Sequence, residues 1–349
     1  MIESQSTTTS ASTATSAAAS ASTPVAASAA AAGHTSGLGL GIDAGGTQTR
    51  WALAWPDGAI LAEGIVGGLS ALQMNSDAGH EAVRATFAEL AAAVLLHGVP
   101  ERVQAGLTGF GGDSELLQRW LADLLHIDPA AIHFCSDMEI AYRASFAPGE
   151  GYLVYAGTGS IGAFIDAGGQ FHRAGGRGVA LDDGGGGFWI AREALRHIWR
   201  IEDEHPGSWR ASPMARAVFD YVGGDDWSFS RHFMYAQDRG AIGKLALAVA
   251  ASAGNAGQDK QGQQGDPAAL AILQGAGREL ARLARALVGR FGPRPVALSG
   301  RAAELHPAIL EAMRAALPAE IPLTQTAGGA HHAAARMAVA HPGKNTNEQ

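Results

Sequence analysis

The chain has 349 residues, and 47% of them are hydrophobic, which is enough for a buried core in two domains of ordinary size. The formal net charge of −8 argues against a nucleic-acid-binding surface, although a locally positive pocket for a phosphorylated substrate is compatible with it. The single cysteine, Cys135, excludes an intramolecular disulfide and a cysteine-only metal cluster within one chain. No apolar run reaches the length of about eighteen residues that predicts a membrane span. These features are typical of a cytoplasmic protein.

Residues 1–36 consist almost entirely of serine, threonine and alanine. Such a composition cannot bury enough apolar surface to order itself, so we expect a disordered tail. A signal peptide is the competing interpretation. The segment lacks a basic start and a leucine- or valine-rich stretch, and Glu3 has the wrong charge for that role.

The pattern from residue 37 to residue 147 predicts the order β-β-β-α-β-α-β-α. Apolar or alternating segments predict strands at 38–46, 49–56, 59–66, 103–110 and 131–137. Helical spacing predicts helices at 77–98, 114–126 and 138–146. The sequence Pro56–Gly58 predicts a turn between the second and third strands.

After residue 148 the same rhythm begins again. Residues 151–176 predict a strand, a glycine loop, a strand, a turn and a third strand. A polar loop at 254–266 precedes a long helix at 267–292, and 294–305 predict a strand, a glycine turn and the start of a helix. The last predicted helix lies within 328–340. The repeated order indicates an internal duplication.

Two glycine-rich loops occupy matched places in the two halves, DAGGTQT at 43–49 and AGTGS at 156–160. Such turns can point backbone N–H groups at anionic oxygens, and their hydroxyls add donors, so two facing loops can hold the β- and γ-phosphates of ATP. The candidate phosphate-binding residues are Gly45, Gly46, Thr47, Thr49, Gly157, Thr158, Gly159 and Ser160. Asp43, at the end of the first strand, can hold Mg²⁺ through water. A tight hairpin turn is the alternative interpretation of either loop alone, and no Walker motif is present.

Five segments stand in the order found in the sugar kinases of the actin-like ATPase superfamily. They are GIDAGGTQTR, FCSDMEIAYRA, VYAGTGSIGAF, LDDGGGGFWIAREAL and VALSGRAAEL. Over about 37–340 the chain most resembles the N-acetylglucosamine kinase and glucosamine kinase group, which includes the BadF/BcrA-type ATPases. This resemblance implies an α/β fold of two actin-like (ribonuclease H-like) lobes with mixed sheets flanked by helices and a central cleft. The lobes would be 37–147 and 148–328, with a last helix at about 329–340 that packs back on the first.

The resemblance implies transfer of a phosphoryl group from MgATP to an amino sugar at O6, with ATP and Mg²⁺ required. Asp137 falls where the family has the carboxylate that orients the sugar hydroxyl and accepts its proton. The alternative is that Asp137 is the N-cap of the helix that follows.

Sugar contacts are also implied by resemblance. Asp182 falls at the sugar-binding aspartate, with Asp183 as second choice, and helix capping is the alternative role for both. Asn75 falls in the region of a sugar-contacting asparagine, in a poorly matched stretch, and Gly109 belongs to a turn expected to line the cleft floor.

The turn at Ser299, Gly300 and Arg301 resembles the adenosine-binding turn, where glycine lets the nucleoside lie close to the backbone. Three histidines stand near these motifs. Adjacent helical residues do not share a face, so we expect no metal site at His331 and His332 and expect one of the pair to be exposed. His133 falls at a core position of its strand, which favours a buried, hydrogen-bonded histidine.

Three alternatives are weighed against an active kinase. A dehydratase-activating ATPase holds an iron–sulfur cluster through cysteines, which a single cysteine disfavours. A repressor of the same fold needs an N-terminal helix-turn-helix, whose pattern is lacking here. A sensor without catalysis is expected to lose Asp43 or Asp137, and both are present. The amino sugar stays open among N-acetylglucosamine, glucosamine, N-acetylmannosamine and muramic derivatives, and so does homodimer formation.

Overall fold

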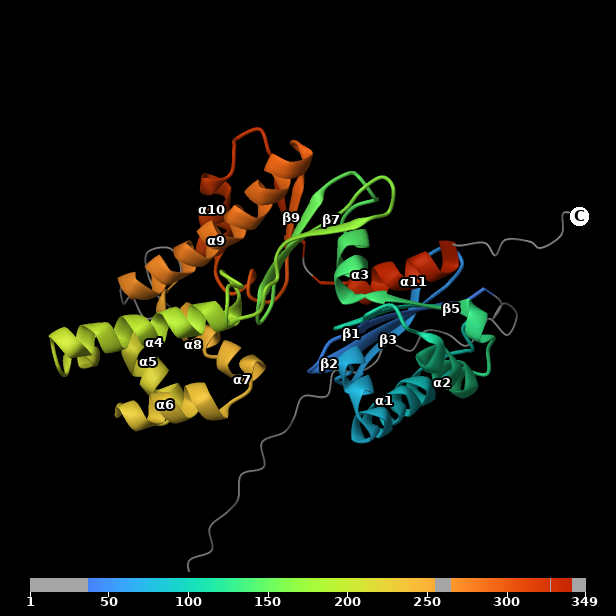
Figure 1. The fold of residues 1–349 in the computed structure, drawn as a ribbon, viewed down its shortest axis with the longest axis horizontal. Helices are drawn as coiled ribbons and strands as arrows, with labels where there is room; N and C mark the ends of the chain where they lie inside the picture. Colours follow the sequence, from blue (N-terminus) through green and yellow to red (C-terminus); the bar gives the residue numbers. More distant parts are fainter. Residues whose placement is uncertain (1–36, 255–264, 327, 341–349) are drawn as a thin grey trace, which may run out of the picture. The chain divides into compact units, whose positions relative to one another are not determined.

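The computed structural model describes residues 37–254, 265–326 and 328–340, and these segments are coloured in Figure 1. The predicted tail at 1–36 and most of the polar loop at 254–266 lie outside the described residues.

The first lobe contains a five-stranded sheet in the order β3-β2-β1-β4-β5 (Figure 1). Its strands are β1 (Gly39–Ala44), β2 (Gln48–Ala54), β3 (Ile60–Gly67), β4 (Arg102–Leu107) and β5 (Ile132–Ser136). Strands β1 to β3 pair antiparallel, whereas β1, β4 and β5 run parallel. Its helices are η1 (Ala71–Asn75), α1 (Asp77–Leu95), α2 (Glu115–Leu125), η2 (Pro129–Ala131) and α3 (Asp137–Arg143). The predicted order of strands and α-helices is confirmed.

The second lobe repeats this topology. Its sheet has the order β10-β9-β6-β7-β8, so its first strand again pairs antiparallel with the second strand on one side and parallel with the fourth strand on the other. The strands are β6 (Tyr152–Ala156), β7 (Ser160–Ile165), β8 (Phe171–Gly175), β9 (Val296–Ser299) and β10 (Leu323–Thr326). The lobes therefore share the same strand order, as the repeated sequence rhythm predicted.

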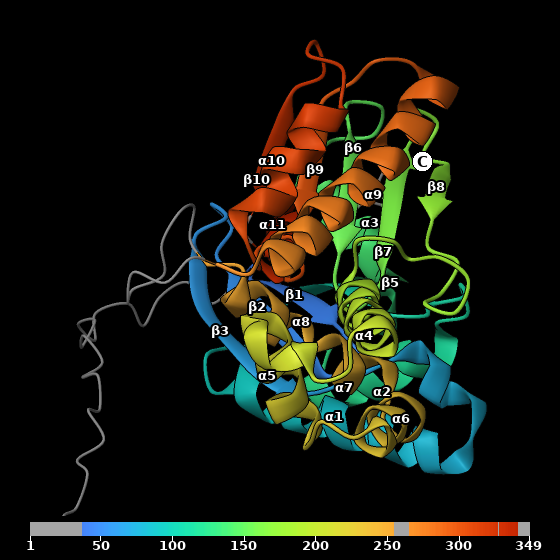
Figure 2. The same ribbon diagram turned by 90° about the vertical axis from the view of Figure 1, so that its left-hand side faces the viewer.

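Helices flank the second sheet and form a subdomain beside it. They are α4 (Gly187–Glu204), η3 (Ser208–Ala211), α5 (Pro213–Val222), α6 (Trp227–Ala236), α7 (Arg239–Gly243), α8 (Ala246–Ser252), α9 (Pro267–Phe291) and α10 (Pro307–Ala316). Figure 2 shows α9 and α10 side by side. The helix predicted to start near 301–305 begins instead at Pro307, because proline suits the first helical position and the His306 side chain accepts from the N–H of Ala308.

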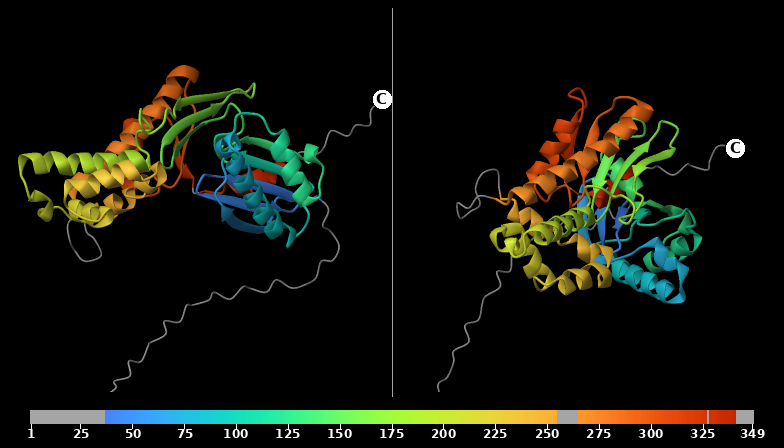
Figure 3. Two further views of the ribbon diagram at one scale, coloured as in Figure 1. Left: turned by 60° about the horizontal axis from the view of Figure 1, so that its bottom comes forward. Right: turned by 60° about the vertical axis from the view of Figure 1, so that its left-hand side comes forward.

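Alternation along β2 divides the first lobe into two packed layers. Trp51 and Leu53 face the core formed with α1 and α2, which lie together in Figure 3. Ala52 and Ala54 face the opposite side, where they pack against Ala335 of the last helix, α11 (Ala330–Ala340).

Glycine in β1 allows α11 to approach the sheet closely. A Cβ atom at Gly41 would lie 2.1 Å from the backbone N of Ala335 and 2.2 Å from the carbonyl O of His331. No larger residue fits there without displacing the helix, so the small residues in this strand are required by backbone packing. The last helix is thereby placed on β1 and β2.

His133 is exposed on β5, so the expectation of a buried histidine was wrong. Its neighbours Ile132 and Phe134 point into the core, and alternation directs His133 to the other face. Within the described residues, no helix combines the length and the apolarity that crossing a membrane requires.

Candidate active site

Two carboxylates meet at the carboxyl ends of the parallel strands of the first lobe. Strand β4 lies between β1 and β5, and Asp43, Thr108 and Asp137 lie at or just after the ends of these three strands. The Thr108 hydroxyl donates to Asp137 Oδ2 over 2.6 Å, and the backbone N of Met138 donates to Asp137 Oδ1 over 2.8 Å. The Asp137 carboxylate is therefore held in one orientation.

Ser136, not Asp137, caps helix α3. The Ser136 side chain accepts from the backbone N of Glu139, and Asp137 is the first residue of the helix. The capping role that competed with a chemical role for Asp137 is thus filled by its neighbour. Its carboxylate is turned toward Thr108 of the adjacent strand instead.

Asp43 is in an environment that disfavours its charged form. Burial raises the pKa of Asp43 to about 6, the nearby charge of Asp137 adds to the increase, and Arg50 opposes it. Two carboxylates in this arrangement favour a cation between or beside them. Carboxylate oxygens are the ligands that Mg²⁺ prefers, so the residues present suit that ion.

The first glycine loop connects β1 and β2 by a tight turn, in which Gly45 N donates to the carbonyl O of Gln48 over 3.1 Å. A Cβ atom at Gly46 would meet nothing within 4 Å, so there is open space beside this backbone. Thr47 is exposed. Thr49 is fully buried in β2 and its hydroxyl has no partner among the described residues, so it does not face solvent with the others.

The second glycine loop connects β6 and β7 and is bound to the start of α4. The carbonyl oxygens of Gly157 and Thr158 accept from the backbone N atoms of Gly187 and Phe188 over 2.8 and 2.9 Å. Ser160 is buried and donates its hydroxyl to the carbonyl O of Gly184 over 2.7 Å. The Ser160 hydroxyl therefore links the second glycine loop to Gly184, and this hydrogen bond already uses its proton.

Of the two adjacent aspartates, Asp183 is the one that faces this loop. A Cβ atom at Gly159 would lie 2.2 Å from Asp183 Oδ2, and Asp183 Oδ1 accepts from the backbone N of Gly178 over 3.0 Å. Asp183 has a φ of 51°, an uncommon value for a non-glycine residue, and burial raises its pKa.

Asp182, the predicted sugar ligand, faces helix α9 and not the second glycine loop. Its two carboxylate oxygens accept from Nη2 of Arg282 over 3.0 and 2.9 Å, which links the loop to helix α9. This pairing occupies the carboxylate. The two adjacent side chains therefore have different partners, which the sequence pattern did not reveal.

The predicted adenosine turn lies beside the second glycine loop. Ser299 pairs with Tyr155 across the parallel strands β9 and β6. Gly300 has a φ of 100°, and a Cβ atom there would lie 2.4 Å from the carbonyl O of Ala156. Glycine is required at this position, and it brings the exposed Arg301 to the same edge of the sheet.

Of the two remaining predicted sugar contacts, Gly109 follows Thr108 directly and Asn75 is the last residue of η1, which packs on the same turn. Gly109 has a φ of 75°, and a Cβ atom there would lie 2.6 Å from Cγ of Leu72 in η1, the helix that ends at the exposed Asn75. Ser70, just before η1, donates its hydroxyl to the carbonyl O of Thr108 over 3.0 Å.

Sequence reasoning missed Tyr155, Arg50 and Thr108. Burial and the charges of Asp43 and Asp137 raise the pKa of Tyr155, which places this phenol in the electrostatic surroundings of both carboxylates. Arg50 follows the first glycine loop and lowers the pKa of Asp43. Arg50 and Tyr155 stand one or two residues from a glycine motif, which is the only signal that could have found them.

Residues 40–327 match the model of the BadF/BadG/BcrA/BcrD ATPase family. A candidate N-acetylglucosamine kinase from Chromobacterium violaceum is 26% identical with a TM-score of 0.60, over 88% of this chain and 100% of that chain.

Two other solved structures share the fold. One is a candidate N-acetylglucosamine kinase from Porphyromonas gingivalis, with 18% identity, a TM-score of 0.65 and coverage of 86% of this chain and 98% of that one. The other is a ROK family glucokinase from Streptomyces griseus in complex with glucose and AMPPNP, with 17% identity, a TM-score of 0.57 and coverage of 87% and 100%. The two-lobed architecture is that of the actin-like sugar kinases.

Proposed function

Because the chain belongs to the BadF/BadG/BcrA/BcrD ATPase family, with the actin-like sugar kinase fold, we propose that it is an ATP-dependent amino-sugar kinase. The substrate is N-acetylglucosamine or glucosamine, and the acceptor is the O6 hydroxyl. Similarity to a candidate N-acetylglucosamine kinase at 26% identity supports this substrate class.

Asp137 is the general base of the proposed reaction. The sugar O6 attacks the γ-phosphorus, its proton passes to the Asp137 carboxylate, and the bond from the γ-phosphorus to the bridging oxygen breaks to release ADP. Thr108 supports this role because its hydrogen bond fixes one carboxylate oxygen.

Asp43 would hold Mg²⁺ through water in this proposal. When bound, the ion neutralises charge on the β- and γ-phosphate oxygens. The raised pKa of Asp43 supports the assignment, because Arg50 offsets only part of the effect of burial and of the neighbouring carboxylate.

The two glycine loops would bind the phosphates through backbone N–H groups and exposed hydroxyls. The proposed ligands are Gly45, Gly46, Thr47, Gly157, Thr158 and Gly159. Ser160 and Thr49 are both buried, so in this proposal they support the two loops and do not contact the phosphates directly. The turn of Ser299, Gly300 and Arg301 would hold the adenosine, which its position beside the second loop supports.

For the sugar we propose Asp183 in place of Asp182. Asp183 lies against the second glycine loop, whereas Asp182 is paired with Arg282. Asn75 and Gly109 remain proposed contacts, supported by the packing of η1 on the turn after Thr108.

The electrostatic proximity of Asp43 and Asp137, at the carboxyl ends of the two strands on either side of β4, carries the proposal. A coupled assay of ADP release with MgATP tests it across hexoses and amino sugars. The kinase predicts release that depends on N-acetylglucosamine or glucosamine, with a 6-phosphate product. Hydrolysis that no sugar accelerates would instead indicate a non-sugar ATPase of the family, and sugar binding without turnover would indicate a sensor.

A further inference from the structure

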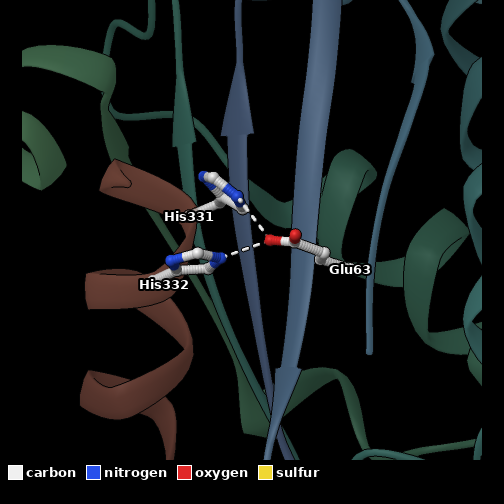
Figure 4. Close-up of side chains that lie close together, drawn as sticks. All are labelled: Glu63, His331 and His332. Atoms are coloured by element: carbon white, nitrogen blue, oxygen red, sulfur yellow. Dashed lines mark hydrogen bonds and ion pairs between the residues drawn. The ribbon is translucent and has the colours of Figure 1, made fainter. Parts of the chain in front are cut away.

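Two histidines of α11 and a glutamate of β3 converge on one point. Glu63, His331 and His332 each offer one ligand atom, and these three atoms all lie within 4.8 Å of one another (Figure 4). The two ring centroids are 4.1 Å apart. The expectation that neighbouring helical histidines would diverge was therefore wrong for this pair.

Small residues in the sheet explain how the three side chains meet. Gly41 of β1 lets the first turn of α11 approach the sheet, and Ala52, the partner of Glu63 across β2 and β3, leaves room above β2. The carboxylate of Glu63 can then reach both imidazoles at the start of the helix. His332 lies 269 residues from Glu63 in the chain, so tertiary packing alone creates the cluster.

The neighbouring protein groups leave both ring nitrogens of His331 without a good hydrogen bond. Its side chain is nine-tenths buried, and its Nε2 lies 3.4 Å from Glu63 Oε2, which is longer than an ordinary hydrogen bond. Its Nδ1 is buried and has no hydrogen-bond partner among the described residues. His332 Nε2, by contrast, contacts the same Glu63 oxygen directly.

We propose that Glu63, His331 and His332 form a binding site for a divalent transition-metal ion, with Zn²⁺ as the expected occupant. Two imidazoles and one carboxylate are a donor set that Zn²⁺ accepts, with water in the fourth position. In a tetrahedral site with bonds of about 2.0–2.1 Å, ligand atoms lie about 3.3 Å apart. The 3.4 Å between His331 Nε2 and Glu63 Oε2 matches this spacing, whereas His332, which contacts the same oxygen directly, has to move away from it when an ion binds.

The cluster is open to water on one side. Glu63 and His332 are 57% and 32% exposed, so an ion has a path of entry and room for water. A bound ion would link the last helix to the edge strand β3 of the first sheet.

Direct metal binding by the full-length chain tests the site independently of any kinase activity. The protein is stripped with a chelator and titrated with Zn²⁺ in competition with a chromophoric chelator. Co²⁺ serves as a spectroscopic substitute, and melting is followed with and without Zn²⁺. The variants are Glu63→Gln and His332→Gln, both at partly exposed side chains, and the matched control is His133→Gln at the exposed histidine of β5.

The proposal predicts that the wild type and His133→Gln each bind one Zn²⁺. Glu63→Gln and His332→Gln should lose this Zn²⁺ or bind it at least tenfold more weakly. The proposal also predicts a Co²⁺ spectrum of low coordination number and a Zn²⁺-dependent increase in Tm for the wild type. Equal binding by all four proteins would overturn the proposal. If either variant fails to fold, the wild type alone still tests the proposal. The proposal is overturned if the wild type gives no spectrum of bound Co²⁺ and its Tm does not change with Zn²⁺.

Discussion

The hydroxyl of Thr108 donates to Asp137 Oδ2 across 2.6 Å, although 29 residues separate them in the chain. Thr108 follows β4 and Asp137 follows β5, so the parallel pairing of these strands brings the two together. The bond leaves Asp137 with a fixed orientation, which a proton acceptor at a sugar hydroxyl needs.

Asp137→Asn is expected to lower kcat by a factor on the order of 10² to 10⁴ with little change in the KM of the sugar. The amide keeps the shape of the side chain but cannot accept the hydroxyl proton. Steady-state kinetics measure this, with circular dichroism as the control for folding. A kcat near that of the wild type would remove Asp137 from the role of base.

Thr108→Val is expected to lower kcat about tenfold, because the carboxylate of Asp137 loses the hydrogen bond that positions it. Thr108→Ser keeps a hydroxyl and should restore most of the rate. The comparison of kcat with the KM of the sugar separates positioning from binding. If valine and serine reduce kcat equally, the hydroxyl has no part in the reaction.

Asp183→Asn is expected to raise the KM of the sugar roughly ten- to a hundredfold, the range for a lost hydrogen bond to a charged group. Asparagine tolerates the positive φ at this position, so the backbone should be unchanged.

Asp182→Asn is the matched control, because it weakens only a partly exposed ion pair with Arg282, worth at most about 1 kcal/mol. Steady-state kinetics of both variants over a range of sugar concentrations decide whether Asp183 or Asp182 binds the sugar. An increase in KM for Asp182→Asn alone would return sugar recognition to Asp182.

The stability of Asp43→Asn should depend on pH. The folded pKa of Asp43 is about 6, above its ordinary value of 3.8, so this carboxyl stabilises the fold most below pH 4 and loses that contribution as pH rises toward 6. The variant should therefore be more stable than the wild type at pH 7, by about 2–3 kcal/mol without ligands, and equally stable at pH 4.

Urea unfolding from pH 4 to pH 8 measures this difference, with Asp123→Asn at an exposed position of α2 as control. Binding of Mg²⁺ with nucleotide, measured by calorimetry, should weaken in Asp43→Asn. A stability difference that does not change with pH would contradict the assignment of a raised pKa.

Gly46→Ala tests whether phosphates approach the first glycine loop. A Cβ atom there meets nothing within 4 Å, so the free energy of unfolding should hardly change. If the γ-phosphate lies against this backbone, the added methyl group should raise the KM of ATP about tenfold or more. Gly289→Ala, at another open position on α9, is the control and should leave the KM of ATP unchanged. An unchanged KM in both would exclude close contact at Gly46.

Local patterns in the sequence were sufficient for the strand and helix order of the first lobe. Alternation in β2 and helical spacing in α1 reflect burial of one face, and that burial is recorded in consecutive residues. The glycine loops were visible for the same reason, because backbone turns and close approaches restrict the residue at a single position.

Contacts between distant segments could not be predicted in this way. Which of Asp182 and Asp183 faces the second glycine loop depends on one backbone φ angle and on Arg282 of a helix a hundred residues later. The exposure of His133 likewise depends on which face of β5 the sheet presents to its core.

The cluster of Glu63, His331 and His332 shows the same division. The sequence by itself determined two adjacent histidines at the start of a helix, and their spacing predicted divergence. Only the tertiary structure decided that they meet, because Gly41 and Ala52 allow the helix to lie close enough to the sheet for one carboxylate to reach both rings. Side-chain periodicity describes a helix in isolation, whereas a site depends on the distance to a different element.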